Sequence, residues 1–217
     1  MKTLLTLITL VALSVQAAPK PNVVLIFIDD MGYGDIGPFG NKVNKTPHLD
    51  RMAKEGLKLT QFYVSNTACT PSRSALMTGT YAHRIGMDGR VVFPGEKRGL
   101  NPKEITIAEL LKKRGYVTGC FGKWHLGMPV NNRDNPAPAE HGFDYWFGLV
   151  NGPGPSHRNP TNFLRNGERV GTMKGYSCQI VVDEALTWLD KKRDGDEPFF
   201  LNLWFNEPHD PIAAPDE

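Results

Sequence analysis

The sequence predicts an α/β fold in which helices sandwich a mostly parallel central sheet. Three apolar runs, at residues 22–28, 116–121 and 199–205, are continuous rather than alternating, which is typical of strands covered on both faces. Helix signals separate these runs, and the order strand, helix, strand favours parallel pairing. With 217 residues and 40% hydrophobic content, the chain can bury one sizeable core.

The first 17 residues predict a cleavable export signal. Lys2 precedes an apolar run at residues 4–15, and the small residue Ala17 follows. The run is too short to cross a bilayer comfortably, and later apolar segments are shorter still. We therefore expect residues 18–217 to form an exported protein without membrane attachment, periplasmic or secreted, or lysosomal in a eukaryote.

The first expected strand, at residues 22–28, ends in two adjacent carboxylates, Asp29 and Asp30. Open α/β sheets bind their ligands at the carboxyl ends of the strands, where this pair lies. Two neighbouring carboxylates repel each other unless a cation joins them, and oxygen ligands are typical of a hard cation. A solvated acidic turn is the alternative for such a pair taken alone.

Three helices and a further strand are expected between the first two apolar runs. Residues 46–56 begin with a Thr-Pro pair and place apolar side chains at helical spacing before a glycine. Residues 57–64 alternate in the manner of a strand. Thr106 and Glu109 form a capping box for the second helix, which ends at Gly115.

Cys69 is expected at the first turn of a third helix. Pro71 suits that turn because it lacks an N–H group, and no helix breaker follows until Gly79. A helix N-terminus favours a thiolate and can hold an anion, because its N–H groups and dipole are positive. Arg73 can reach back toward Cys69 or toward an anion beside it. A buried structural cysteine near a surface arginine is the alternative.

Lys123 and His125 come just after the strand expected at residues 116–121. If the extended conformation continues, both side chains project to the same side, and Trp124 between them turns away to pack. His209 follows the strand expected at residues 199–205 in the same way. These polar groups therefore join Asp29 at the carboxyl ends of strands.

The middle of the chain is harder to assign. Apart from an apolar run at residues 143–150, residues 128–160 are rich in Pro, Gly and Asn, and the whole segment is expected to loop over the site. Residues 163–170 predict a β-hairpin with its turn at an Asn-Gly pair. Residues 178–193 predict a long helix whose apolar face packs on the core.

Three cysteines leave at least one thiol unpaired in any arrangement of disulfides, and Cys69 fits that role if it is kept for chemistry. Cys120 and Cys178 either pair or remain two buried free thiols. The net charge of +2 and the lack of a dense Lys/Arg cluster argue against a nucleic-acid surface.

The segment from Cys69 to Arg73, followed by Leu-Met-Thr-Gly at residues 76–79, resembles the signature of the sulfatase family. The resemblance implies an alkaline-phosphatase-like α/β fold, and oxidation of Cys69 to formylglycine by a formylglycine-generating enzyme. One hydroxyl of the hydrated aldehyde would attack the sulfur of a sulfate ester, and the second would later expel sulfate. Negative charge builds up on the sulfuryl oxygens in such a reaction and requires nearby cations.

The resemblance extends to the strand ends. It implies that Asp29, Asp30 and the modified Cys69 hold one Ca²⁺. It also implies that Lys123 binds sulfate oxygens and that His125 helps to hold the formylglycine hydroxyls or the leaving group.

Two later positions resemble the family as well. His209 matches a second sulfate-binding histidine, and Ser156 or His157 falls where the family presents a further side chain to the sulfate. The resemblance covers residues 18–217 and corresponds to the N-terminal part of a sulfatase catalytic domain. The remaining calcium ligands and a small second domain are then expected beyond residue 217.

The expected activity is hydrolysis of sulfate monoesters, with a sulfated carbohydrate or an aryl sulfate as substrate. One alternative is a phosphoester hydrolase of the same superfamily, but those relatives generally use Ser or Thr as the nucleophile. The other alternative is a catalytically silent fragment that keeps the fold and a sulfate-binding pocket.

Overall fold

A computed structural model describes residues 19–128, 135–192 and 195–215 of the chain. The export signal expected at residues 1–17 lies outside these ranges. Among the described helices, none combines the length and the apolar character needed to cross a membrane.

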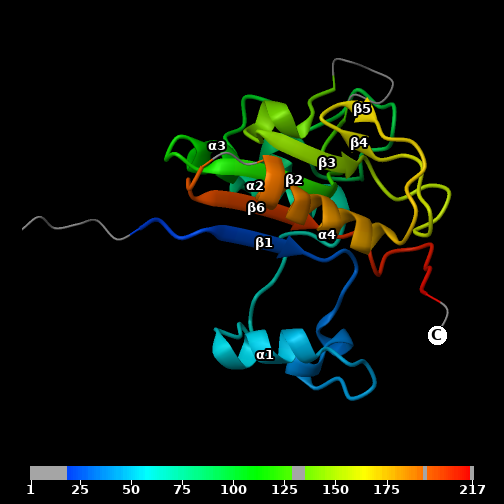
Figure 1. Cartoon of the computed structure of the whole chain (residues 1–217). Coiled ribbons are helices and arrows are strands. Elements are labelled where there is room, and N and C mark those ends of the chain that lie inside the picture. Colours follow the sequence, from blue (N-terminus) through cyan, green and yellow to red (C-terminus); the bar gives the residue numbers. More distant parts are fainter. Residues whose placement is uncertain (1–18, 129–134, 193–194, 216–217) are drawn as a thin grey trace, which may run out of the picture.

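The structure is built on a six-stranded sheet with the strand order β1-β6-β2-β3-β4-β5 (Figure 1). Four neighbouring strands run parallel: β1 (Val23–Phe27), β6 (Phe199–Trp204), β2 (Val117–Lys123) and β3 (Tyr145–Leu149). Two short strands, β4 (Leu164–Arg165) and β5 (Glu168–Arg169), continue the sheet in antiparallel pairing. The mostly parallel sheet predicted from the sequence is therefore confirmed.

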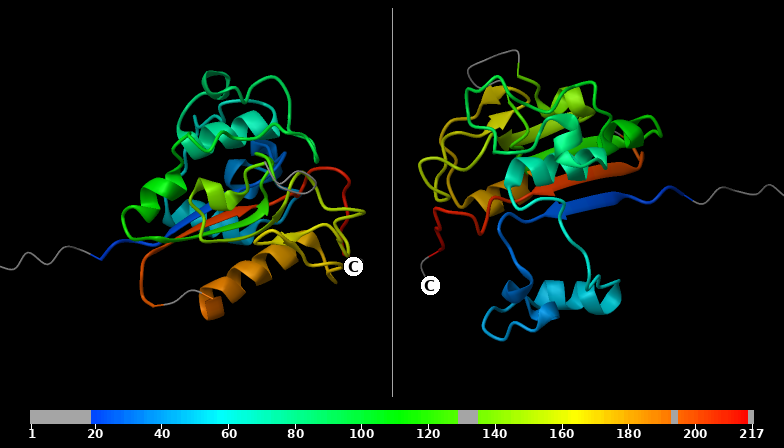
Figure 2. Two further views of the ribbon diagram at one scale, coloured as in Figure 1. Left: turned by 90° about the horizontal axis from the view of Figure 1, so that it is seen from above. Right: turned by 180° about the vertical axis from the view of Figure 1, so that it is seen from behind.

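Helices cover both faces of this sheet, as Figure 2 shows. Helices α2 (Cys69–Thr78) and α3 (Ile107–Lys112) lie on one face, and α4 (Ser177–Thr187) lies on the other. Side chains of β6 alternate between the two cores: Phe200 and Trp204 join the α2/α3 side, whereas Leu201 and Leu203 join the α4 side. Burial on both faces explains the continuous apolar sequence of the strands.

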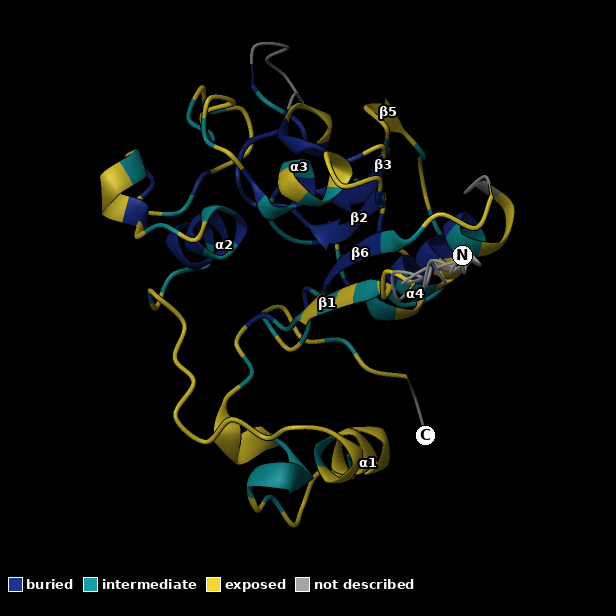
Figure 3. Cartoon of the chain, turned by 90° about the vertical axis from the view of Figure 1, so that its left-hand side faces the viewer, coloured by how far each residue is buried: buried dark blue, intermediate teal, exposed yellow. Residues whose placement is uncertain are grey.

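The chain between β1 and α2 leaves the sheet and returns to it (Figure 1). It contains short 3-10 turns at Tyr33–Asp35 and Gly37–Phe39, and then helix α1 (Pro47–Glu55). The helix expected at residues 46–56 is confirmed, but none of its residues is buried (Figure 3). Its apolar face therefore adds little to the described core.

The prediction of a strand at residues 57–64 is wrong, because these residues form no strand. Leu57 and Tyr63 are 84% and 73% exposed. An alternating segment becomes a strand only when a neighbour pairs with it and a core covers one of its faces. Within the described chain, residues 57–64 have neither.

The apolar run at residues 143–150, which the sequence left within a loop, contains β3. This strand pairs with β2 from Gly119 to Lys123. Gly148 allows the close approach, since a Cβ atom there would lie 2.3 Å from the carbonyl oxygen of Gly122. Both cores cover this short strand. The sequence did not predict it because Pro, Gly and Asn residues surround it.

The remaining elements largely follow the sequence. The hairpin at residues 163–170 forms as β4 and β5, and α4 continues into a π-helical turn at Trp188–Lys192. Further 3-10 turns lie at Ala82–Ile85 and Pro138–His141.

All three cysteines are free thiols, which decides between the two alternatives for Cys120 and Cys178. Cys120 packs in the core on the α2/α3 side, where the side-chain amide of Asn202 approaches its sulfur at 3.4 Å. Cys178 lies at the start of α4 on the other face. The sheet separates the two thiols.

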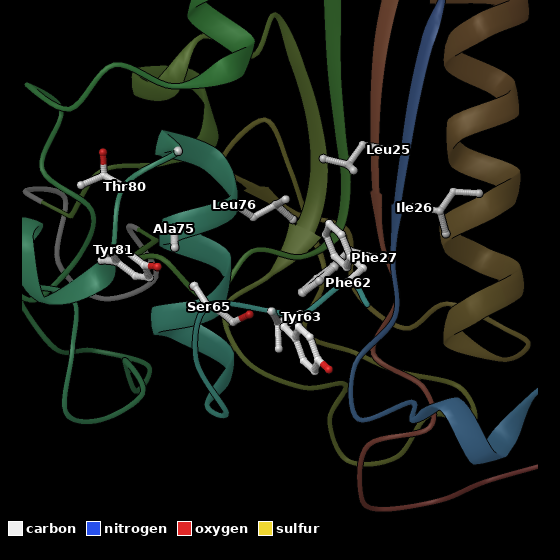
Figure 4. Close-up of a pocket in the computed structure, with 13 residues that line it drawn as sticks. Leu25, Ile26, Phe27, Phe62, Tyr63, Ser65, Ala75, Leu76, Thr80 and Tyr81 are labelled. Carbon is white, nitrogen blue, oxygen red and sulfur yellow. The ribbon is translucent and has the colours of Figure 1, made fainter. Parts of the chain in front are cut away.

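An apolar cavity of about 550 Å³ lies between β1, α2 and the segment before α2 (Figure 4). Its walls include Phe27, Leu76 and Phe62. None of its lining residues is Asp, Glu, His, Lys or Arg, so the cavity supplies no side chain that carries a charge at neutral pH. The candidate site must lie elsewhere.

The capping box of α3 predicts a measurable contribution to stability. Thr106 is fully buried; its hydroxyl accepts the Glu109 N–H at 3.2 Å and donates to the carbonyl oxygen of His141 at 2.7 Å. We expect Thr106→Ala to lower the free energy of unfolding by about 1–2 kcal/mol, and Thr106→Ser to recover most of it. Urea denaturation measures the effect. Thr187→Ala is a near-neutral control, because the half-buried Thr187 hydroxyl donates to the Asp183 carbonyl oxygen of its own helix and alanine favours a helix. Equal stability of the Ala variant and the wild type would contradict this assignment.

Candidate active site

Three parallel strands end at the same edge of the sheet and bring the predicted site residues together. β1 leads into Asp29, β2 ends with Lys123, and β6, which lies between them, leads toward His209. Helix α2 begins at this edge with Cys69. The carboxyl edge of a parallel sheet is the usual ligand site of open α/β folds, so the placement agrees with the sequence analysis.

The carboxylate of Asp29 lies between two buried cations. Lys123 Nζ contacts Asp29 Oδ2, and Arg73 Nη2 lies 3.2 Å from Asp29 Oδ1. Burial alone raises the pKa of Asp29, but the charges of Arg73 and Lys123 outweigh it and hold the pKa below its usual value. Asp29 is therefore ionised and anchors both cations.

Arg73 is fully buried and held from several directions. Its Nη1 donates to the carbonyl oxygen of Lys123 at 3.0 Å. Its guanidinium carbon lies 4.9 Å from the centre of the Trp204 ring and 5.2 Å from that of Phe27. Arg73 therefore acts near the start of α2 mainly through its ion pair with Asp29. The two aromatic rings stabilise its buried positive charge.

Cys69 is half-buried, with its sulfur 3.6 Å from Lys123 Nζ. Burial raises the pKa of the thiol, and the Asp29 carboxylate adds to this, whereas Lys123 and Arg73 lower it. The net pKa lies above the usual value, so the thiolate expected from the helix N-terminus is wrong. Desolvation and the Asp29 carboxylate together outweigh the two cations.

His125 is buried next to the start of α2, where its backbone carbonyl accepts the Thr70 hydroxyl at 2.8 Å. The expected extension of β2 through His125 is wrong, because the strand ends at Lys123 and His125 has a left-handed φ of 56°. Trp124 packs in the core as predicted. Burial, with the charges of Lys123 and Arg73, lowers the pKa of His125 to about 3, so its ring is neutral.

Of the other predicted residues, Asp30 and His209 lie at the rim, whereas Ser156 and His157 belong to a separate loop. The side chain of Asp30 is 58% exposed, and its Oδ2 lies 3.8 Å from Nε2 of His209, which is 36% exposed. The hydroxyl of Ser156 accepts the N–H of Arg158 at 3.1 Å, a contact within its own loop. The adjacent His157 is buried and points its Nδ1 toward Ser177 and Glu207.

The structure groups three potential metal ligands. Ligand atoms of Asp29, Cys69 and His209 all lie within 4.8 Å of one another. The sequence had paired Asp29 and Cys69 with Asp30, which lies on the rim beside His209. Calcium requires six to eight oxygen ligands. The carboxylates of Asp29 and Asp30 and an oxygen at position 69 are ligands of the type that calcium prefers, although they are fewer than it requires.

Two supporting residues escaped the sequence analysis. Thr70 links the start of α2 to two loops, because its hydroxyl donates to the carbonyl oxygen of His125 and also accepts the N–H of Val92 at 3.0 Å. Trp204 stacks over Arg73. Thr70 lies inside the recognised segment, which was a usable signal. In the sequence, Trp204 is indistinguishable from a core residue because it lies within an apolar strand.

The neutral state of His125 predicts how stability depends on pH. The folded state keeps the ring unprotonated down to a pH of about 3, whereas the unfolded chain takes up a proton below about 6.5. Above pH 6.5 the His125 ring does not change the free energy of unfolding. As the pH falls from 6.5 toward 3, the ring lowers that free energy by about 1.4 kcal/mol per pH unit.

Urea denaturation across this range tests the expectation with His125→Asn. The variant cannot titrate there, so its stability should fall less steeply with acidification than that of the wild type. Thr187→Ala serves as the control and should keep the wild-type slope. Parallel curves for His125→Asn and wild type would show that His125 protonates equally well in both states.

Comparisons with known proteins agree with this geometry. The profile of the family described as Sulfatase matches residues 21–217. Mouse steryl-sulfatase is 46% identical over 181 residues, which cover 79% of this chain and 27% of that protein. Dog N-acetylgalactosamine-6-sulfatase is 36% identical over 234 aligned residues, which cover 97% of this chain and 44% of that protein.

Solved structures give the same result. The structure described as Ps i-CgsB in complex with k-i-k-neocarrahexaose matches with a TM-score of 0.80 and 33% identity, covering 91% of this chain and 47% of that one. The chain thus spans about a quarter to a half of the length of these relatives. The family match over residues 21–217, together with the shared fold, shows that the chain belongs to the sulfatase family.

Proposed function

We propose that this chain carries the nucleophile and most of the sulfate-binding groups of an enzyme that hydrolyses sulfate monoesters. The observation that supports it is the charge balance beside Cys69. Two buried cations, Lys123 and Arg73, face a single buried carboxylate, Asp29. The surplus positive charge suits a sulfate group and the charge that develops on its oxygens during transfer.

Each residue has a distinct part in this proposal. Lys123, whose Nζ lies 3.6 Å from the Cys69 sulfur, binds the sulfuryl oxygens. Arg73 holds Asp29 and the Lys123 backbone in place. His125 is neutral, so its ring can donate one hydrogen bond and accept another. At the rim, His209 and Ser156 contact the sulfate from the solvent side.

Two groups would complete the site. Oxidation of Cys69 to formylglycine by a generating enzyme would supply a hydrated aldehyde whose hydroxyl is the nucleophile. Calcium, held by Asp29, Asp30 and the oxygen at position 69, would draw negative charge from that oxygen and from the sulfate. Asp29 keeps its charge for this purpose because Arg73 and Lys123 lower its pKa.

Relatives support a sulfated carbohydrate as the substrate class. They include N-acetylgalactosamine-6-sulfatase from dog and a structure described as a complex with D-Glucosamine-2-N, 6-O-disulfate, which is 29% identical with a TM-score of 0.72. Mouse steryl-sulfatase is the contrasting relative, because its name specifies a steryl group rather than a sugar. Sulfated sugars and aryl sulfates therefore form the first substrate panel.

Export belongs to the same proposal. The apolar segment before residue 18 would direct the chain out of the cytoplasm, to the periplasm or beyond. N-terminal sequencing of the protein recovered outside the cytoplasm tests this, and an intact Met1 there would contradict cleavage.

Conversion of Cys69 is the first prediction to test. Co-expression with a formylglycine-generating enzyme should lower the mass of the tryptic peptide that carries Cys69 by about 18 Da, because a thiol becomes an aldehyde. The peptides that carry Cys120 and Cys178 are internal controls and should keep their masses. A Cys69 peptide of unchanged mass beside a control substrate that is converted would contradict the proposal.

Activity of the converted protein is the second prediction. With calcium present, it should hydrolyse sulfate esters faster than the matching phosphate esters. Lys123→Ala should lower kcat by about a hundredfold or more, because it removes a fixed donor to the transferring group. Faster turnover of phosphate esters would favour the phosphoester hydrolase. Saturable sulfate binding without turnover would favour a silent binding fragment.

A further inference from the structure

Three separate segments meet at the start of α4. They are the loop that contains Ser156 and His157, the first turn of α4, and the chain that follows β6. None of their shared contacts takes part in the ionic cluster around Asp29. The meeting point nevertheless lies one residue from Ser156 and two residues from His209.

A carboxylate from outside the helix caps α4. The N-cap residue, Tyr176, makes no side-chain cap. Instead, Glu207 Oε1 accepts the backbone N–H of Cys178 at 2.9 Å and the hydroxyl of Ser177. Unpaired N–H groups and the helix dipole both favour a carboxylate there, so the chain after β6 is fixed to the first turn of α4.

His157 joins the same carboxylate. Its Nδ1 lies 2.7 Å from Ser177 Oγ and 3.0 Å from Glu207 Oε1, and its carbonyl oxygen accepts the Ser177 N–H at 2.9 Å. Because Ser177 already donates its hydroxyl proton to Glu207, Nδ1 must carry a proton to complete the arrangement. The imidazole is 1% exposed, so its position is closely determined.

His209 has few restraints of its own. His209 Nδ1 contacts only the carbonyl oxygen of the next residue, Asp210, among the hydrogen bonds of the described chain, and Nε2 lies 3.8 Å from Asp30. The N–H of His209 donates to the carbonyl oxygen of Asn206 at 3.0 Å, which closes a turn around Glu207. The position of His209 therefore follows from the position of Glu207.

We propose that Glu207 and His157 are positioning residues that hold His209 and Ser156 against the sulfate at the rim of the site. One carboxylate fixes both loops to the same rigid helix, so the two sulfate contacts keep a constant separation. Small displacements of binding groups lower the reaction rate by up to about a hundredfold. Fixing both loops to one helix avoids that loss. The inference rests on the proposed function for the roles of His209 and Ser156.

Histidine-selective NMR of the folded chain tests the positioning without any turnover. The chain has six histidines, so each ring can be assigned by substitution. Glu207→Ala should shift the ring signals of His157 and His209 and leave His141, in the α3 region, unchanged. Glu207→Gln keeps an acceptor oxygen for the helix and should keep His209 close to its wild-type signal.

Glu184→Gln is the matched control. Glu184 is a buried carboxylate on the same helix, and it pairs with Arg165 at 2.6 Å, away from the rim. This variant should lower stability without moving the His209 signal. If Glu207→Ala does not fold, His157→Asn provides the second variant and should still move His209. An unchanged His209 signal in either folded variant overturns the proposal.

Kinetics of the converted enzyme provide the second readout. Glu207→Ala should lower kcat/KM for a sulfate ester by about tenfold to a hundredfold, mostly through a higher KM, and Glu207→Gln should recover most of the loss. A purely structural role would change the melting temperature of both variants and leave KM alone. If the wild type itself shows no turnover, the proposed function fails, and the NMR signals still decide whether Glu207 positions His209.

Discussion

The carboxylate of Asp29, held between Arg73 and Lys123, ties three elements of the fold to one point. Asp29 follows β1, Arg73 belongs to α2, and Lys123 ends β2. Burying any of these charges alone would be costly, and removal of one partner from such a group typically destabilises a protein by about 3–5 kcal/mol. Because the three are stable only together, the helix that carries Cys69 has one allowed place at the edge of the sheet.

This arrangement sets the protonation states of the site as well. The same two cations that keep Asp29 ionised also oppose protonation of His125, and burial reinforces their effect on that ring. Burial and Asp29 together keep the thiol of Cys69 protonated in spite of the cations. The result is a neutral residue 69 in a positive setting, which suits an incoming anion and a nucleophile created by chemical modification.

The site has a rigid centre and an open rim. Arg73, Lys123 and His125 are buried, whereas Asp30 and His209 are partly open to solvent. The centre is ordered by charge and by aromatic rings from β1 and β6. The rim depends on hydrogen bonds at the start of α4, where Glu207 and His157 meet. The centre and the rim therefore rest on different parts of the fold.

The sequence by itself determined the fold class, the helix at Cys69, the capping box at Thr106 and the clustering of Asp29, Lys123 and His209 at strand ends. These follow from local rules: apolar runs, capping residues and the common edge of parallel strands. Only the tertiary structure decided that Cys69 keeps its proton, that residues 57–64 form no strand and that Glu207 caps α4. Each of these depends on the burial of a polar group or on a partner distant in sequence, and a local apolar pattern reports neither.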